Sequence, residues 1–99
     1  MIFAQNGQFL GIITRNPYSS NSIANKYGTY GSRFSGNSIF NTFGQYGSTF
    51  SSLSPWNPAG SQPPMIVINN QAVAYLSKNP ARSPRVDLDT VTMCIGRAQ

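Results

Sequence analysis

The side chains that enzymes use for proton transfer are scarce in this chain. It contains no histidine and no glutamate, and its only two carboxylates are Asp87 and Asp89. General acid–base catalysis relies mostly on His, Glu or Asp held at a suitable pKa. The sequence therefore offers no obvious general base, and we expect a protein that is not an enzyme.

Cysteine occurs once, at Cys94, so no internal disulfide can form. The cysteine content therefore does not indicate whether the protein works in an oxidising or a reducing compartment. A catalytic thiolate needs a neighbouring base or positive charge, and without histidine only Arg97 or a backbone dipole remains. An enzyme using Cys94 is therefore the last alternative, and a buried structural cysteine is favoured. Asp87 and Asp89 lack a third oxygen ligand nearby, so we expect no metal site and no cofactor.

Long apolar runs are also absent, and none approaches the length that spans a bilayer. No secretory leader is visible, and residues 1–5 begin inside a predicted strand. A leader was therefore either removed or never present. The first case favours export or the cell envelope, and the second favours the cytoplasm.

Charged residues are few and mostly positive: they make up only 9% of the chain, and the net charge is +5. A basic domain can attract nucleic acid or other anions, which makes an anion- or nucleic-acid-binding adaptor one alternative function. The candidate anion contacts are Arg15, Lys78, Arg82 and Arg85. Because nucleic-acid binders show denser basic stripes, solubilising charge is the favoured interpretation and nucleic acid is disfavoured as a partner.

The dominant positive feature is an internal repeat over residues 19–62. Residues 19–34 align without a gap on residues 35–50, with ten of sixteen positions identical, and a degenerate third copy follows. A fixed short period is typical of one structural unit stacked on itself.

Each unit is predicted to contain one helical turn followed by an aromatic loop. The predicted N-caps are Ser22, Ser38 and Ser54, and the predicted left-handed ends are Gly28, Gly44 and Gly60. Four-residue spacing would place Ile23 with Tyr27, and Ile39 with Phe43, on a shared face. The loop side chains Tyr30, Phe34, Tyr46 and Phe50 are predicted to point inward.

The same aromatic residues have a second interpretation. Rings interleaved with Asn, Ser and Gln are typical of carbohydrate-binding surfaces, where rings stack and amides form hydrogen bonds. The candidate ligand contacts are Trp56, Tyr30 and Tyr46. Aromatic residues at equivalent repeat positions are more often core, so the core interpretation is favoured.

A second, longer repeat relates residues 6–17 to residues 69–80. Asn6-Gly7 and Asn69-Asn70 suit type I′ turns and predict hairpins over residues 1–14 and 64–77. In the first hairpin the predicted register pairs Ala4 with Phe9 and Phe3 with Leu10. One predicted face carries Ile2, Ala4, Phe9 and Ile13; in the second hairpin one face carries Met65, Val67, Ala72 and Leu76. Both faces of each hairpin are apolar, which predicts either cover on both faces or one covered face and one merely apolar face.

The C-terminal segment is predicted to form a strand over residues 86–95, with a bulge near Asp89. The alternative is a short helix capped by Asp89, with Leu88, Val91 and Ile95 on one stripe. The Val and Thr content favours the strand. Exposed edges or faces of a small sheet invite pairing, so a homodimer is a reasonable expectation.

Residues 6–79 resemble a group of small, uncharacterised bacterial proteins. The shared pattern is Asn-x-[Tyr/Phe]-Gly-x-Tyr-Gly-Ser-x-Phe-Ser, flanked by Gly-x-Phe-Leu-Gly and Pro-Pro-x-Ile-x. Many such proteins are exported, and some are carried as accessory or mobile genes, but the group supplies no activity or ligand. Its members often have an acidic residue near Ser20-Asn21. That residue is absent here, which argues against metal binding in those loops.

Together these features predict a single α+β domain over residues 1–99. Its antiparallel sheet would consist of two pseudo-symmetric hairpins and a C-terminal strand, covered by one-turn helices and aromatic loops. The leading functional hypothesis is a non-catalytic binding or structural module of unknown ligand, at the cell envelope or outside the cell.

Overall fold

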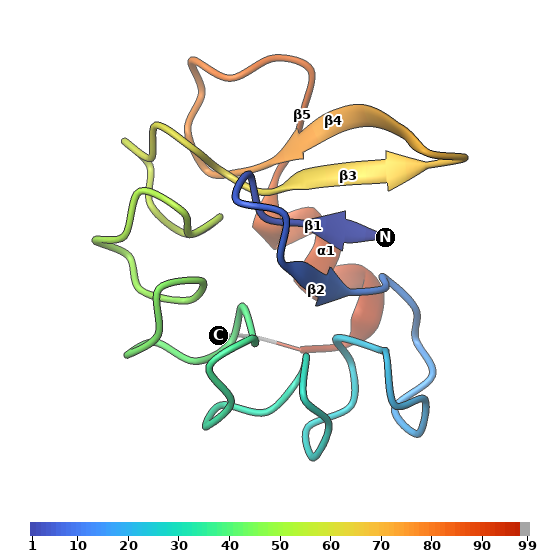
Figure 1. The fold of residues 1–99 in the computed structure, drawn as a ribbon. Coiled ribbons are helices and arrows are strands. Elements are labelled where there is room, and N and C mark those ends of the chain that lie inside the picture. Colours follow the sequence, from blue (N-terminus) through green and yellow to red (C-terminus); the bar gives the residue numbers. More distant parts are fainter. Residues whose placement is uncertain (98–99) are drawn as a thin grey trace.

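The computed structural model of the chain describes residues 1–97 and contains one five-stranded sheet and one helix (Figure 1). The elements are β1 (Ile2–Phe3), β2 (Phe9–Gly11), β3 (Met65–Ile68), β4 (Gln71–Leu76), β5 (Arg85–Val86) and α1 (Leu88–Ile95). The strand order is β2-β1-β3-β4-β5, and β5 runs parallel to β4 whereas the other neighbours are antiparallel. The α+β character is confirmed, but the sheet is mixed rather than wholly antiparallel.

The turn of the first hairpin is longer than the predicted two-residue type I′ turn. The N–H of Gly7 donates to the carbonyl of Ala4, and the N–H of Ala4 donates to the carbonyl of Gln8, both at 2.9 Å. Gly7 has a φ of 93°. One residue of positive φ after a tight turn is the pattern of a three-residue hairpin loop with a bulge.

This longer turn changes the predicted faces of the first hairpin. Phe3 pairs with Phe9 instead of Leu10, and the two rings lie 5.3 Å apart on the same side. Leu10 is instead buried in the core with Ile2 and Ala4. The predicted pairing of Phe3 and the predicted faces of Phe9 and Leu10 were therefore wrong by one residue, which in a strand exchanges the two faces. A register shift between Ile2 and Phe3 then pairs Ile2 with Gly11, in agreement with the predicted register.

The second hairpin keeps the predicted turn. Asn69 and Asn70 have φ values of 52° and 65°, as a type I′ turn requires. The register shifts farther along, where Ile66 pairs with Ala74 and leaves Val73 as an extra residue. Leu76 therefore joins the core beside Ile66, and its predicted place with Met65 and Val67 was wrong.

The predicted strand over residues 86–95 was wrong beyond Val86, because Leu88–Ile95 forms helix α1. The cap is Asp87, not Asp89: its side chain accepts a hydrogen bond from the N–H of Asp89 at 2.9 Å. Gly96 ends the helix with a φ of 74° in the left-handed region. The buried stripe contains Leu88, Val91 and Ile95, as the helical alternative predicted. Packing of this stripe outweighs the strand preference of Val and Thr.

The repeat segment forms consecutive turns rather than one-turn helices. Backbone N–H groups donate to carbonyls three residues earlier, from Ser22 to Ser19, from Asn25 to Ser22 and from Gly28 to Asn25, at 3.1–3.2 Å. The second unit repeats all three bonds. The predicted helices were wrong because the three-residue bonds are not followed by a run of four-residue bonds, which would continue an α-helix. Each of these two units has one isolated four-residue bond, from Ser32 to Gly28 and from Ser48 to Gly44, both at 2.9 Å.

Glycine has a different role in these units from the predicted one. Among the described residues, the glycines of positive φ are Gly7, Gly11 and Gly96, so the repeat glycines do not adopt the predicted left-handed conformation. Gly47 is instead required for close approach, because a β-carbon there would overlap the carbonyl group of Asn41. Gly31 stands in the same relation to Asn25 in the first unit.

Three consecutive positions of each unit point into the core. They are Ser22-Ile23-Ala24, Ser38-Ile39-Phe40 and Ser54-Pro55-Trp56, and all nine residues are buried. They pack against residues of the sheet and of α1, including Ile2, Leu76 and Leu88. The repeat segment therefore winds as an arc of turns around one side of the molecule (Figure 1).

Arg97 fastens the end of α1 to this arc. It is buried, and its Nη1 donates to the carbonyls of Ile23 and Gly31 at 2.8 and 2.6 Å. Its guanidinium lies 3.9 Å from the ring centroid of Phe40. This arginine is thus part of the core and not a partner for the thiol of Cys94.

Candidate functional site

The most unusual surface of the molecule is a series of exposed aromatic rings in and beside the repeat segment. We call this series the outer aromatic row; it consists of Tyr18, Tyr27, Phe34, Phe43 and Phe50, which are 89–97% exposed. Phe34 and Phe50 hold equivalent positions of successive units, and so do Tyr27 and Phe43. Single exposed apolar residues are ordinary, but a periodic series of large rings calls for a physical reason.

The backbone under each ring is held by the same type of turn. In every case the N–H of the aromatic residue donates to a side-chain oxygen two residues earlier. The pairs are Tyr18 with Asn16, Tyr27 with Asn25, Phe34 with Ser32, Phe43 with Asn41, and Phe50 with Ser48, at 3.0–3.2 Å. Each ring is thus carried on a fixed turn while its faces remain in water.

The asparagine of each unit also ties the turn back to the start of its unit. The side-chain N–H of Asn25 donates to the carbonyl of Ser19 at 3.1 Å, and Asn41 binds Ser35 in the same way. In the third unit Asn57 keeps the pattern, but the residue in the aromatic position is Ala59. The turn therefore forms without an aromatic side chain at its tip.

A cleft of about 270 Å³ opens between the first two rings of the row. Its lining consists of Pro17, Tyr18, Ala24, Asn25, Lys26 and Tyr27. Lys26 is exposed, and no ion pair joins it to either aspartate in the described part of the chain. The cleft thus combines two aromatic side chains, an amide and a positive charge.

The predicted ligand contacts lie elsewhere. Trp56 and Tyr46 are buried: the indole N–H donates to the carbonyl of Ile39 at 2.7 Å, and the Tyr46 hydroxyl accepts from Asn6 at 2.9 Å. Tyr30 is half-buried and packs edge-on against Phe9, with ring centroids 4.9 Å apart. All three are held in or against the core, as the favoured core interpretation expected.

Other ring predictions were wrong. Phe34 and Phe50 were predicted to point inward, and Tyr27 and Phe43 were predicted to share a face with buried isoleucines, but all four are exposed. The sequence did contain a signal for this result. In Asn-x-Tyr, Asn-x-Phe and Ser-x-Phe, the first residue can accept the N–H of the third, which marks a turn tip rather than a helix face.

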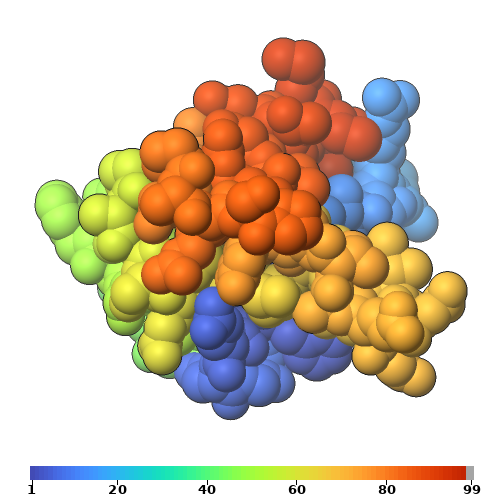
Figure 2. All heavy atoms as spheres, turned by 90° about the horizontal axis from the view of Figure 1, so that it is seen from above, coloured from blue at the N-terminus to red at the C-terminus, as the bar shows by residue number. Residues whose placement is uncertain are grey.

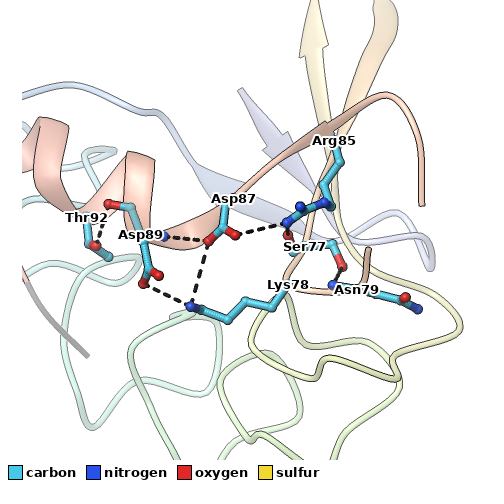
Figure 3. Close-up of polar contacts among 7 residues, drawn as sticks. All are labelled: Ser77, Lys78, Asn79, Arg85, Asp87, Asp89 and Thr92. Carbon is cyan, nitrogen blue, oxygen red and sulfur yellow. Dashed lines mark hydrogen bonds and ion pairs between the residues drawn. The ribbon is translucent and has the colours of Figure 1, made fainter. Parts of the chain in front are cut away.

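The predicted anion contacts are largely occupied by partners within the chain (Figure 3). Lys78 lies 2.9 Å from a carboxylate oxygen of Asp89 and 3.7 Å from one of Asp87, and Arg85 lies 3.0 Å from Asp87. Arg82 donates to the carbonyl of Ser61 at 2.9 Å. Lys78 and Arg85 thus bind both carboxylates of the chain instead of forming an open basic patch.

These pairs shift two pKa values. Chiefly the hydrogen bond from the backbone N–H of Asp89, helped by Arg85 and Lys78, lowers the pKa of Asp87 below its ordinary value. The hydrogen bond to Asp89 raises the pKa of Lys78. The cluster therefore stabilises the start of α1 through the charged forms of both groups.

The remaining candidates lie beside α1. Arg15 donates to the carbonyl of Cys94 at 2.7 Å, and both residues line a shallow depression of about 380 Å³ with Asp89 and Met93. Cys94 is exposed, so its predicted burial was wrong. Among residues 1–97, no three His, Cys, Asp or Glu side chains come together as metal ligands do.

No family model, curated protein or solved structure matches the chain significantly. Within the described range, no helix combines the length and apolar character needed to cross a bilayer.

Proposed function

We propose that this protein is a non-catalytic binding module and that the outer aromatic row is its ligand-contacting surface. The observation that carries the proposal is the exposure of five aromatic side chains on turns of one type. Rings fixed in this way need no further ordering of their backbone when a ligand covers them, which lowers the entropic cost of binding.

The energetics favour a functional reason for these rings. Burying one Phe side chain contributes about 1.5–3 kcal/mol to stability, and the fold gains almost none of this from the row. The turn itself does not need an aromatic residue, because Ala59 occupies the same place in the third unit. The aromatic residues at the equivalent tips, Tyr27 and Phe43, are therefore best explained by contact with something outside the chain, and we extend this explanation to the whole row.

The alternatives have weaker support. A basic adaptor would need open cations, but Lys78 and Arg85 are paired with aspartates. Homodimerisation through a sheet edge would use β2 or β5, which contain only three and two residues.

Export or a place in the cell envelope agrees with the resemblance of the repeat to exported bacterial proteins and stays a proposal. The pseudo-symmetry of the two hairpins also stays a proposal: their sequences are alike, but their turns differ.

A binding panel tests the proposal. The wild-type protein and a triple variant, Phe34→Ser, Phe43→Ser and Phe50→Ser, would be compared on a glycan array, on phosphatidylcholine/phosphatidylglycerol vesicles and on single-stranded DNA. We expect the wild type to bind at least one probe and the triple variant to lose most of that binding. Thermal unfolding would check that the variant keeps its fold.

The matched control is Ile68→Ser, which removes an exposed apolar side chain at the end of β3, outside the outer aromatic row and its cleft. It should bind as the wild type does. Equal binding by wild type and triple variant, or no binding of any probe, would overturn the proposal.

A further inference from the structure

We propose that the outer aromatic row binds a linear polysaccharide carrying acidic groups, with one acidic sugar seated between Tyr18 and Tyr27. This inference rests on the proposed binding function and names the class of its ligand. It depends on four properties of the row: its repetition, the chemistry of its cleft, its charge and its shape.

Repetition points to a ligand that is itself repetitive. The same turn carries a ring at Tyr27 and Phe43, and again at Tyr18, Phe34 and Phe50. Equivalent units placed side by side create an extended series of similar contacts. A polymer of similar sugars can occupy such a series in successive places, whereas a single small molecule would use only one of them.

The cleft has the chemistry that sugars require. Flat rings contact the C–H faces of sugar rings, and amide or ammonium groups bind hydroxyl or carboxylate oxygens. The Tyr18–Tyr27 cleft offers both rings with Asn25 and Lys26. Its volume of about 270 Å³ lies just below the ~300–1,000 Å³ typical of drug-sized ligands. It therefore suits one sugar ring of a longer chain.

Charge favours an acidic ligand. Residues 1–86 contain no carboxylate, and the two that follow, Asp87 and Asp89, are bound by Lys78 and Arg85. No negative side chain therefore opposes an anion at the row, and Lys26 is one of the residues that line the cleft. Attraction between Lys26 and a sugar carboxylate would be modest and would weaken with salt, as for other exposed pairs.

The shape of the row and its low density of positive charge favour an acidic polysaccharide over an anionic membrane or a nucleic acid. The turns fan out along an arc, and the start and the middle of the repeat segment project on opposite sides of the body (Figures 1 and 2). A flat membrane cannot contact all tips of such an arc, whereas a flexible chain can follow it. Single-stranded nucleic acid carries one phosphate per nucleotide, but residues 16–62 contain only Lys26 and Arg33 as cations.

Isothermal titration with oligomers of defined length in which uronic acids alternate with uncharged sugars, hyaluronan for example, tests the inference on the full chain. Affinity should rise with oligomer length and then level off when the row is filled. It should fall as salt is raised. Neutral cello-oligomers of equal length should bind more weakly.

Single variants locate the contacts. Tyr27→Ser and Phe43→Ser should each weaken binding of a long acidic oligomer about two- to tenfold. Lys26→Gln should weaken acidic oligomers by up to about fivefold and leave neutral oligomers unchanged. Ile68→Ser serves again as the control with unchanged affinity.

The possible failures are distinguishable. Preference for neutral oligomers, vesicles or single-stranded DNA, with that binding still lost in the ring variants, would overturn the ligand class and leave the proposed function standing. Acidic oligomers bound equally by wild type and ring variants would overturn both, because the contact would then lie outside the row.

Discussion

The sheet with α1 and the repeat segment share one core but are held together by different means. The sheet strands are fixed by main-chain pairing, and the pairing of Ile2 with Ile66 joins two hairpins that are distant in sequence. Each repeat unit is fixed locally, by turns and by Ser and Asn side chains that bind the backbone. The sheet is stabilised by backbone hydrogen bonds, which do not depend on the type of side chain. The repeat is stabilised by hydrogen bonds from individual side chains. The repeat should therefore be the more sensitive region to single substitutions at its inner positions.

The largest effect is expected where inner and outer positions of one unit are compared. Phe40 is fully buried, and Phe43 is 97% exposed. Phe40→Ala should lower the free energy of unfolding by about 3–5 kcal/mol, because it empties a ring-sized space in the core. Phe43→Ala should change it by less than about 0.5 kcal/mol. Urea unfolding of both variants measures this difference, and similar values for the two would refute the inner–outer arrangement.

A pair of glycine substitutions gives the next largest contrast. Gly47→Ala should destabilise by about 3 kcal/mol, because the added methyl group overlaps the backbone of Asn41 and the turn must move. Gly36→Ala places its methyl group in open space and should be close to neutral. Thermal unfolding compares the two. An equally tolerated Gly47→Ala would mean that the turns are not packed as described.

Asn41 tests whether side chains hold the repeat. It donates to the carbonyl of Ser35 and accepts the N–H of Phe43, so Asn41→Ala should cost about 1–3 kcal/mol. Asn41→Asp keeps the acceptor and loses the donor, and an intermediate loss is expected. In the sheet, Asn70→Gly should be neutral or slightly stabilising, because glycine suits a type I′ turn. Chemical denaturation of the three variants ranks them.

The smallest effect concerns acid and the start of α1. Because folding lowers the pKa of Asp87, its carboxylate stabilises the fold above the ordinary Asp pKa of about 4. That contribution is lost as the pH falls through the lower folded-state value. Asp87 is more than a third exposed, so the effect should be a few tenths of a kcal/mol.

Asp87→Asn separates charge from capping. Asparagine also caps helices well, so α1 should persist while the acid dependence of stability becomes flatter than in the wild type. Unfolding measured between pH 3 and pH 6 tests this expectation. An unchanged acid profile would show that the negative charge of Asp87 contributes nothing to stability.

Predictions from short sequence patterns were reliable where a residue type strongly favours one local conformation. Asn69-Asn70 predicted its type I′ turn, and the repeated serines accept backbone N–H groups at Ala24, Phe40 and Trp56 as capping residues do, although in turns rather than helices. The turn after each hairpin also repeats: Asn16 donates its N–H to Thr14, as Asn79 does to Ser77.

Predictions failed where two conformations of a segment have similar free energies when only neighbouring residues are considered. The Val91–Ile95 run suits a strand or a helix, and only its packing against the core selected the helix. The rings of Phe34 and Phe40 are chemically alike, yet one is exposed and the other buried. The candidate site was not predicted for this reason. Trp56, Tyr30 and Tyr46 were predicted as ligand contacts from their type of side chain, whereas the outer aromatic row is distinguished by rings that point into solvent.

By itself, the sequence determined the sixteen-residue period, the presence of two hairpins, the turn residues and the scarcity of catalytic groups, because each is a property of composition or of a few neighbouring residues. Tertiary structure alone decided the strand registers, the helix at the C-terminus and which rings meet water. Those outcomes depend on volumes filled by residues far apart in the chain, and a shift of one residue reverses a strand's faces.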